Sequence, residues 1–186
     1  HSLHHKICLN TKTKSPFISV SEFEDNTGFA KEKLDKVYGK KIIGYRDAMV
    51  LKEAPKKMIV VGSGAIGVEF AYFYNAMGTE VTVVEYMPNI VPIEDIDISK
   101  QLERSFKKTG IKVMTNASVE KVDTSGKTCK ATVKTKKGEE IIEADIVLSA
   151  VGIEANIENI GLEDVGIATD KGRILVNDYY QTNIPV

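Results

Sequence analysis

Hydrophobic residues in the middle of the chain fall into short apolar runs separated by segments with helical spacing. Residues 58–61 and 81–84 are apolar runs of strand length, rich in β-branched side chains. Between them, apolar positions recur at the spacing of a helix up to Met77, and Gly78 follows as a stop signal. Strands that alternate with helices in this way predict a parallel βαβ unit.

The same alternation continues after an irregular loop at 87–92, which carries two prolines. Acidic residues at the start and basic residues at the end of 95–109 predict a second helix, which Gly110 closes. Residues 111–114 follow as a third strand. Three apolar positions at four-residue spacing predict one buried stripe on this helix: Ile98, Leu102 and Phe106.

Residues 117–144 change to the period of β-structure. Polar turns at 125–127 and 136–138 divide this segment into three short runs, which predicts an antiparallel meander. Residues 145–148 follow, with an aspartate and then three apolar residues, which is typical of a buried parallel strand. The predicted fold class is therefore α/β, with a Rossmann-like parallel sheet (βαβαβ) and an inserted three-stranded antiparallel meander.

The connection between the first strand and the first helix carries the pattern GxGxxG: Gly62, Ser63, Gly64, Ala65, Ile66 and Gly67. The first glycine allows a tight turn, the second lets the backbone approach a pyrophosphate, and the third lets the helix pack closely on the sheet. The unpaired N–H groups and the dipole of the following helix favour phosphate. Three glycines alone are weak evidence, but their place between a strand and a helix predicts a dinucleotide site.

An acidic residue closes the second strand of this unit. Glu85 lies 18 positions after Gly67, where a carboxylate can accept hydrogen bonds from an adenosine ribose and would repel a 2′-phosphate. This favours NAD(H); the alternatives are a solvated strand-end acid and a glycine-rich turn without a ligand. The fourth strand ends at the same edge of the sheet, so Ala150 and Gly152 are expected to touch the cofactor.

Three segments resemble the nicotinamide-binding domain of the dihydrolipoamide dehydrogenases, within the flavin-dependent pyridine nucleotide–disulfide oxidoreductase family. They are residues 39–85, the LSAVG run at 148–152 and residues 161–185, and they occur in the family's order at plausible spacing. The resemblance implies an entry strand at 42–44 and a short helix at 45–49.

Three further residues are candidates for cofactor contacts. The resemblance places Glu69 near the nicotinamide end of NAD, and the alternative is a glutamate that stabilises the helix N-terminus through the helix dipole. Val119 lies against the adenine by resemblance, or is a core valine. Tyr86 follows Glu85 directly and is a candidate to cover the adenine edge.

The chemistry of that family uses groups that this sequence does not carry. The resemblance implies a separate FAD-binding segment, a Cys-x4-Cys redox pair and a His–Glu pair in an interface domain. Cys8 and Cys129 are 121 positions apart, and the histidines are His1, His4 and His5. We therefore expect an excised NAD(H)-binding domain with no catalytic residue and no metal site, inactive and monomeric alone. The intact enzyme would bind FAD elsewhere, contact the domain through its FAD and interface domains, and form a homodimer.

The amino-acid composition of the chain limits the classes of binding partner and the cellular location that we expect. A chain of 186 residues with 42% hydrophobic content can build one core of ordinary size. A net charge of −1 and short lysine runs do not favour nucleic acid, and no apolar stretch has the length of a membrane span. Two cysteines fit a reducing, cytoplasmic location. We assign residues 39–186 to the NAD(H)-binding domain, and residues 1–38 remain an unassigned N-terminal segment.

Other functions stay open at this point. One is the NAD domain of another flavoprotein reductase or of an NADH oxidase. Another is a non-catalytic module that senses NADH or mediates assembly, with residues 1–38 as a partner-binding arm. FAD in the glycine loop is disfavoured, because the flavin motif of the resembled family opens the chain, whereas this motif begins at residue 62.

Overall fold

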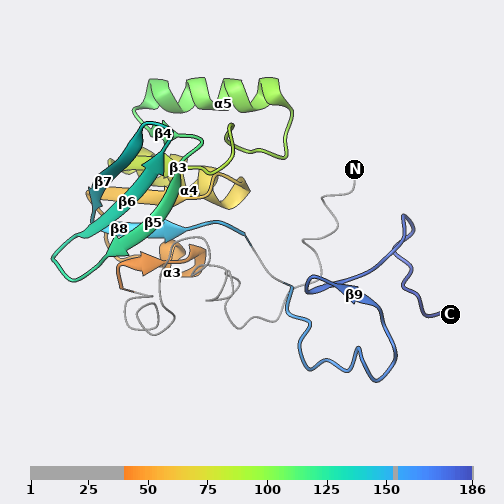
Figure 1. Ribbon diagram of the computed structural model, residues 1–186. Helices are drawn as coiled ribbons and strands as arrows, with labels where there is room; N and C mark the ends of the chain where they lie inside the picture. The colour runs from red at the N-terminus through yellow and green to blue at the C-terminus, as the bar shows by residue number, and fades with distance from the viewer. Residues whose placement is uncertain (1–39, 153–154, 186) are drawn as a thin grey trace. The chain divides into compact units, whose positions relative to one another are not determined.

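The computed structural model describes residues 40–152 and 155–185 of the chain. These residues belong to two compact units that divide at Gly152. The larger unit holds a parallel sheet, its helices and a second sheet, and the smaller unit holds one short hairpin (Figure 1). Residues 1–38, which the sequence leaves unassigned, lie outside the described residues.

A five-stranded parallel sheet forms the centre of the larger unit, in the order β1-β8-β2-β3-β4. Its strands are β1 (Ile42–Ile43), β2 (Lys57–Val61), β3 (Glu80–Val84), β4 (Lys112–Met114) and β8 (Ile146–Ser149). Val61, the last residue of β2, pairs with Val84 on one side and with Ser149 on the other. The carboxyl ends of β2, β3 and β8 therefore meet at one edge, and the predicted parallel βαβαβ arrangement is confirmed.

Three helices follow strands of this sheet: α3 (Tyr45–Met49), α4 (Ala65–Ala76) and α5 (Ile96–Thr109). The Oδ1 atom of Asp95 accepts a hydrogen bond of 2.8 Å from the backbone N–H of Asp97 and caps α5. Gly78 and Gly110 follow α4 and α5 with φ of 91° and 90°, the left-handed conformation that ends a helix. These caps confirm the predicted boundaries. No helix in the described part of the chain is long and apolar enough to cross a membrane.

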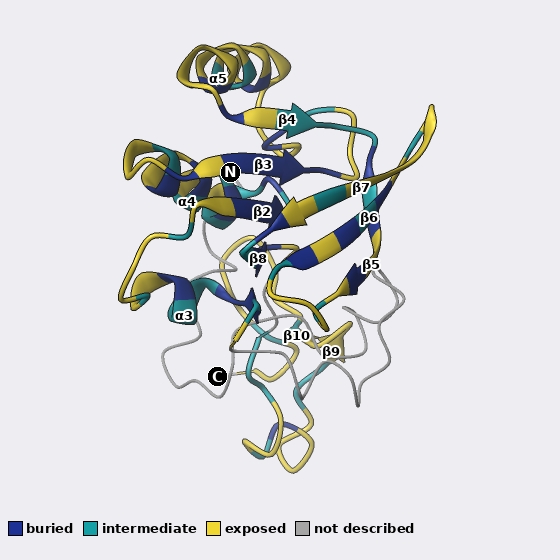
Figure 2. Ribbon diagram, turned by 90° about the vertical axis from the view of Figure 1, so that its left-hand side faces the viewer, coloured by how far each residue is buried: buried dark blue, intermediate teal, exposed yellow. Residues whose placement is uncertain are grey.

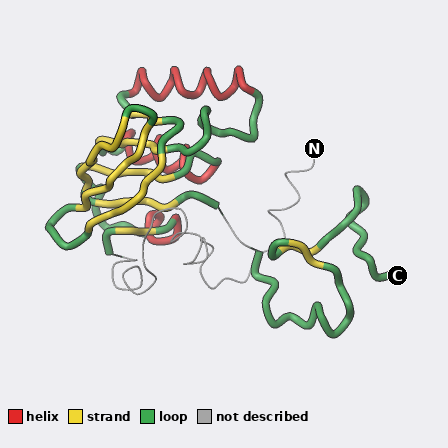
Figure 3. Tube along the Cα trace, viewed as in Figure 1, coloured by secondary structure: helices red, strands yellow, loops and turns green. Residues whose placement is uncertain are grey.

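The meander is a three-stranded antiparallel sheet, as predicted (Figure 3). Its strands are β5 (Ser118–Asp123), β6 (Cys129–Thr135) and β7 (Gly138–Ala144). The Nζ atom of Lys41 donates to the backbone carbonyls of Thr124, at 2.9 Å, and Gly126. These bonds hold the turn between β5 and β6 against the start of the parallel sheet.

The strands of the parallel sheet are buried along most of their length (Figure 2), and two hydrophobic clusters lie on its opposite faces. Along β2, Ile59 and Val61 belong to the cluster shared with the meander, whereas Met58 and Val60 belong to the cluster shared with the helices. A strand buried on both faces needs apolar residues at every position, because successive side chains point to opposite faces. This explains the continuous apolar runs in the sequence.

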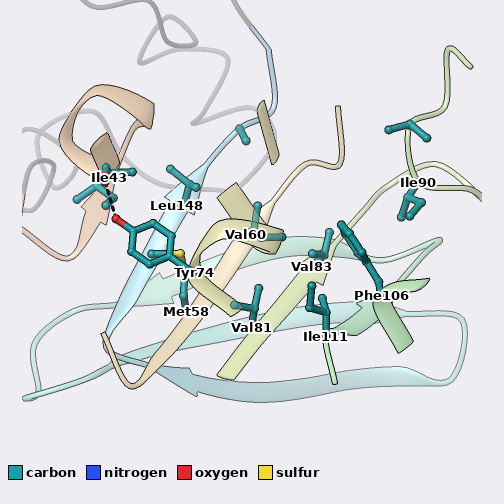
Figure 4. Close-up of a cluster of buried hydrophobic side chains, with 14 residues drawn as sticks. Ile43, Met58, Val60, Tyr74, Val81, Val83, Ile90, Phe106, Ile111 and Leu148 are labelled. Carbon is teal, nitrogen blue, oxygen red and sulfur yellow. Dashed lines mark hydrogen bonds between the residues drawn. The ribbon is translucent and has the colours of Figure 1, made fainter. Parts of the chain in front are cut away.

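Tyr74 links two helices inside the second cluster (Figure 4). Tyr74 is 3% exposed, and its hydroxyl donates to the backbone carbonyl of Ala48 at the end of α3. Burial raises the pKa of Tyr74, so the hydroxyl keeps its proton for this bond.

The smaller unit has little regular structure. Its strands β9 (Thr169–Asp170) and β10 (Arg173–Ile174) pair in antiparallel fashion around a two-residue turn. The side-chain amide of Asn183 closes the unit, because it donates to the carbonyl of Gly166 and accepts from the N–H of Ala168, both at 2.8 Å.

The predicted stripe on α5 is wrong at one position. Phe106 is buried at 2% exposure and Leu102 is half-buried, but Ile98 is 59% exposed. Ser99 lies against the core instead, seven residues before Phe106 and therefore on the same side of the helix. Which side faces inward depends on how the helix docks on the sheet, and spacing alone does not settle this.

We predict that Phe106→Ala lowers the free energy of unfolding by about 3–5 kcal/mol, because the removed ring leaves a cavity. Ile98→Ala, on the same helix, serves as the matched control and should change it by about 0.5 kcal/mol or less. Urea unfolding followed by circular dichroism measures both variants. Equal losses would contradict the placement of α5.

Candidate functional site

The glycine loop lies where three parallel strands end. The N–H of Gly62 donates to the carbonyl of Val84 at 2.9 Å, and the N–H of Ala150 donates to the carbonyl of Val61 at 2.8 Å. These bonds continue the sheet pairing for one residue past β2 and β8. Ligands of such sheets bind beyond the carboxyl ends of the strands, so this edge is the place to look for a site.

The three glycines of the loop meet different surroundings. Gly62 has φ of 93°, and a Cβ added there would lie 2.5 Å from the carbonyl oxygen of Ala150. A Cβ on Gly67 would overlap the carbonyl oxygen of Gly62, because α4 starts directly against the loop. A Cβ on Gly64 would meet nothing within 4 Å. Gly62 and Gly67 therefore serve close packing, whereas the space beside Gly64 is open to an incoming group.

The N-terminus of α4 has no side-chain cap. Gly64 takes the cap position with extended backbone and supplies no hydrogen bond from a side chain, and the first turn carries no acidic residue. The first amide of the helix with an intrahelical acceptor is that of Val68, which donates to the carbonyl of Gly64 at 3.0 Å. The preceding amides and the positive end of the helix dipole suit an anion.

Glu85 is buried beside the loop, with 6% of its surface exposed. Its Oε2 atom accepts hydrogen bonds from the backbone N–H of Ser63 at 2.8 Å and from the Ser63 hydroxyl at 2.6 Å. Its Oε1 atom accepts from the backbone N–H of Met87 at 2.7 Å. Glu85 is therefore held in the loop structure and is not a freely solvated strand-end acid.

The loop after β3 also closes on the glycine loop, which the sequence did not predict. The N–H of Val91 donates to the carbonyl of Ser63 at 2.9 Å, and Ile90 is completely buried. The N–H of Asn116 donates to the carbonyl of Met87 at 3.0 Å. The prolines indicated an irregular segment correctly, but a backbone contact between two loops leaves no local signal in a sequence.

The other predicted site residues differ in exposure. Glu69 is exposed on α4, and Tyr86 is 77% exposed directly after Glu85. Ala150 is 8% exposed at the end of β8, and Gly152 is exposed with φ of 157°. Ala65 is exposed at the start of α4, and Ile66 is half-buried. These residues lie on the segments that follow β2, β3 and β8.

Val119 differs from the other predicted site residues because it is buried in the hydrophobic core on the meander side of the parallel sheet. It is 2% exposed in β5 and belongs to the cluster between the meander and the parallel sheet. Of the two roles considered for this residue, a core valine fits its surroundings.

No cluster in the described residues offers metal or redox chemistry. Residues 40–152 and 155–185 contain no group of three or more His, Cys, Asp or Glu side chains that could hold a metal ion. Cys129 is buried, and desolvation raises the pKa of its thiol to about 11, so it stays protonated near neutral pH. The described edge thus places a buried carboxylate beside backbone amides that suit an anion.

We predict that Gly64→Ala and Gly67→Ala affect folding differently. The added methyl at Gly64 meets open space, so the free energy of unfolding should change by about 0.5 kcal/mol or less. The methyl at Gly67 overlaps a backbone carbonyl, so that variant should lose about 1–3 kcal/mol. Chemical unfolding without added nucleotide measures both, and an equal loss would contradict the distinction.

The sequence of this chain is similar to the sequences of known proteins. The sequence pattern of the pyridine nucleotide–disulphide oxidoreductases matches residues 23–186. Dihydrolipoyl dehydrogenase of Rhizobium etli is 46% identical over 147 residues, which cover 78% of this chain and 31% of that protein. Leghemoglobin reductase of Glycine max is 41% identical over 178 residues, which cover 94% of this chain and 34% of that protein.

Solved structures agree with the sequence comparison. LpdA of Mycobacterium tuberculosis matches with a TM-score of 0.66 and 34% identity, over 75% of this chain and 30% of that one. The flavoprotein disulfide reductase RclA of Escherichia coli matches with a TM-score of 0.65 and 26% identity, over 76% and 32%. The chain thus spans about a third of the length of these relatives. Because the family pattern covers most of its residues, the chain belongs to the pyridine nucleotide–disulphide oxidoreductase family.

Proposed function

We propose that this chain binds NAD(H) at the edge where β2, β3 and β8 end. The observation that carries the proposal is the buried Glu85 carboxylate, hydrogen-bonded to the glycine loop next to the uncapped N-terminus of α4. An acceptor for a ribose and a donor set for phosphates then lie at one edge, in the order that a dinucleotide presents them.

The proposed pose assigns a role to each part of the edge. The pyrophosphate lies against the amides of 64–67, where the open side of Gly64 gives it room. The adenosine ribose lies at Glu85, and the exposed ring of Tyr86 covers the adenine. The nicotinamide half extends toward Glu69 and the Ala150–Gly152 turn, by resemblance to the family.

Charge supports NAD(H) over NADP(H). The family uses FAD and NAD(P), so NAD(H) and NADP(H) are both candidate nicotinamide cofactors. Glu85 would face a 2′-phosphate with like charge in a poorly solvated place, where the repulsion is strong. The described end of β3 carries no arginine or lysine between Glu85 and Val91 to offset this charge.

In the whole protein, we propose that this domain holds the nicotinamide for hydride transfer with FAD in a dihydrolipoyl dehydrogenase. The support is the 46% identity with the dihydrolipoyl dehydrogenase of Rhizobium etli. NAD supplies the hydride chemistry, and the residues of this chain bind and orient it. The FAD and interface domains, a homodimeric assembly and a cytoplasmic location belong to the same proposal, as does inactivity of this segment alone.

We predict that the full 186-residue chain binds NADH more tightly than NADPH, and that Glu85→Ala weakens NADH binding by about tenfold or more. Glu80→Ala is the matched control, since Glu80 begins the same strand and its side chain forms an exposed ion pair with Lys57. Fluorescence titration with NADH, NADPH and FAD measures these affinities.

A preference for NADPH would contradict the role of Glu85. Tighter binding of FAD than of NADH would show that the glycine loop is a flavin site. Equal effects of Glu80→Ala and Glu85→Ala would show that the loss does not arise at the carboxyl end of β3.

A further inference from the structure

Ser63 makes a contact that the glycine pattern does not require, because the second position of GxGxxG accepts any residue. Its hydroxyl donates to Oε2 of Glu85 at 2.6 Å, in addition to the bond from its backbone N–H at 2.8 Å. The backbone bond would exist with any side chain at this position except proline. The hydroxyl bond depends on serine.

The hydroxyl is hidden from any ligand. Ser63 is 0% exposed, whereas Glu85 is 6% exposed. A cofactor at this edge therefore cannot reach the hydroxyl of Ser63, whereas a small part of Glu85 is open to solvent. The hydroxyl donates to the carboxylate of Glu85, so a role in binding through this bond is that of a positioning residue.

The hydrogen bonds that Glu85 already accepts limit how many more its carboxylate can accept from a ligand. A carboxylate has about four acceptor sites. The hydroxyl and N–H of Ser63 fill two sites on Oε2, and the N–H of Met87 fills one on Oε1. The remaining acceptor site is on Oε1. Ser63 thereby fixes the rotation of the carboxylate and determines which oxygen can accept from a ribose hydroxyl.

We propose that the buried Ser63 hydroxyl positions the Glu85 carboxylate for the adenosine ribose and so sets the preference for NADH over NADPH. This inference rests on the proposed NAD(H) function. Without the hydroxyl, Oε2 loses one of its two donors, and the carboxylate can turn away from the ribose and from a 2′-phosphate. The variant should therefore lose NADH affinity and discriminate less against NADPH.

The chain offers a matched control in Ser149. This serine is 1% exposed and pairs with Val61, the residue before Gly62. Within the described residues, its hydroxyl oxygen has no hydrogen-bond partner. Ser149→Ala therefore removes a buried hydroxyl near the same loop without touching Glu85.

The test measures the affinities of the full chain for NADH, NADPH and reduced nicotinamide mononucleotide, which lacks the adenosine. Ser63→Ala should weaken NADH binding by about tenfold and lower the NADH-to-NADPH preference by a similar factor. Binding of the mononucleotide should stay unchanged, and Ser149→Ala should behave as the unaltered chain with all three ligands. In a Glu85→Ala background, Ser63→Ala should have no further effect on NADH, because the two residues act together.

Three results would overturn the inference, and each points to a different fault. If the unaltered chain does not bind NADH, the proposed function fails and the role of Ser63 fails with it. If the chain prefers NADH and Glu85→Ala removes that preference while Ser63→Ala keeps it, only the role of Ser63 fails. If Ser63→Ala weakens all three ligands equally, or adds its full effect in the Glu85→Ala background, Ser63 acts on the fold of the loop and not through Glu85.

Discussion

The buried carboxylate of Glu85 is the constraint on which the rest of the site depends. A carboxylate out of water is costly unless donors surround it. Here the donors come from Ser63 and Met87, which lie on two different loops. The register that pairs Val61 with Val84 brings these loops together. A one-residue slip between β2 and β3 would take both Ser63 donors away from the buried charge and leave only the N–H of Met87.

Close packing at the same edge supports this arrangement. Gly67 and Gly62 leave no room for a side chain between α4 and the loop, and Ala150 continues the tight contact onto β8. The helix therefore starts close to the sheet, and its first amides lie at the edge where Glu85 is held. The three glycines therefore serve different purposes. Gly62 and Gly67 allow close packing of the loop, whereas Gly64 leaves open space beside the loop for a ligand.

The sequence predicted the elements with local signals and missed the features that depend on distant neighbours. Asp95 caps α5 through its side chain, and Gly78 and Gly110 end helices through their left-handed backbone; because these signals are local, the helix ends were predictable. The exposure of Ile98 was not predictable, because it depends on how α5 docks on the sheet. The sequence also identified Glu85 and Ser63 separately, yet their hydrogen bond joins residues 22 positions apart and has no periodic signature.

The central claim is that one sheet edge holds the pyrophosphate at the start of α4 and the ribose at Glu85. Nuclear magnetic resonance of the ¹⁵N-labelled chain, titrated with NADH, tests it most directly. The account predicts that the amide signals of residues 62–68 and 85–87 shift most, together with those of 150–152. It also predicts that signals from the meander strands β5 to β7 stay in place. Large shifts confined to the meander or to residues 155–185 would contradict it.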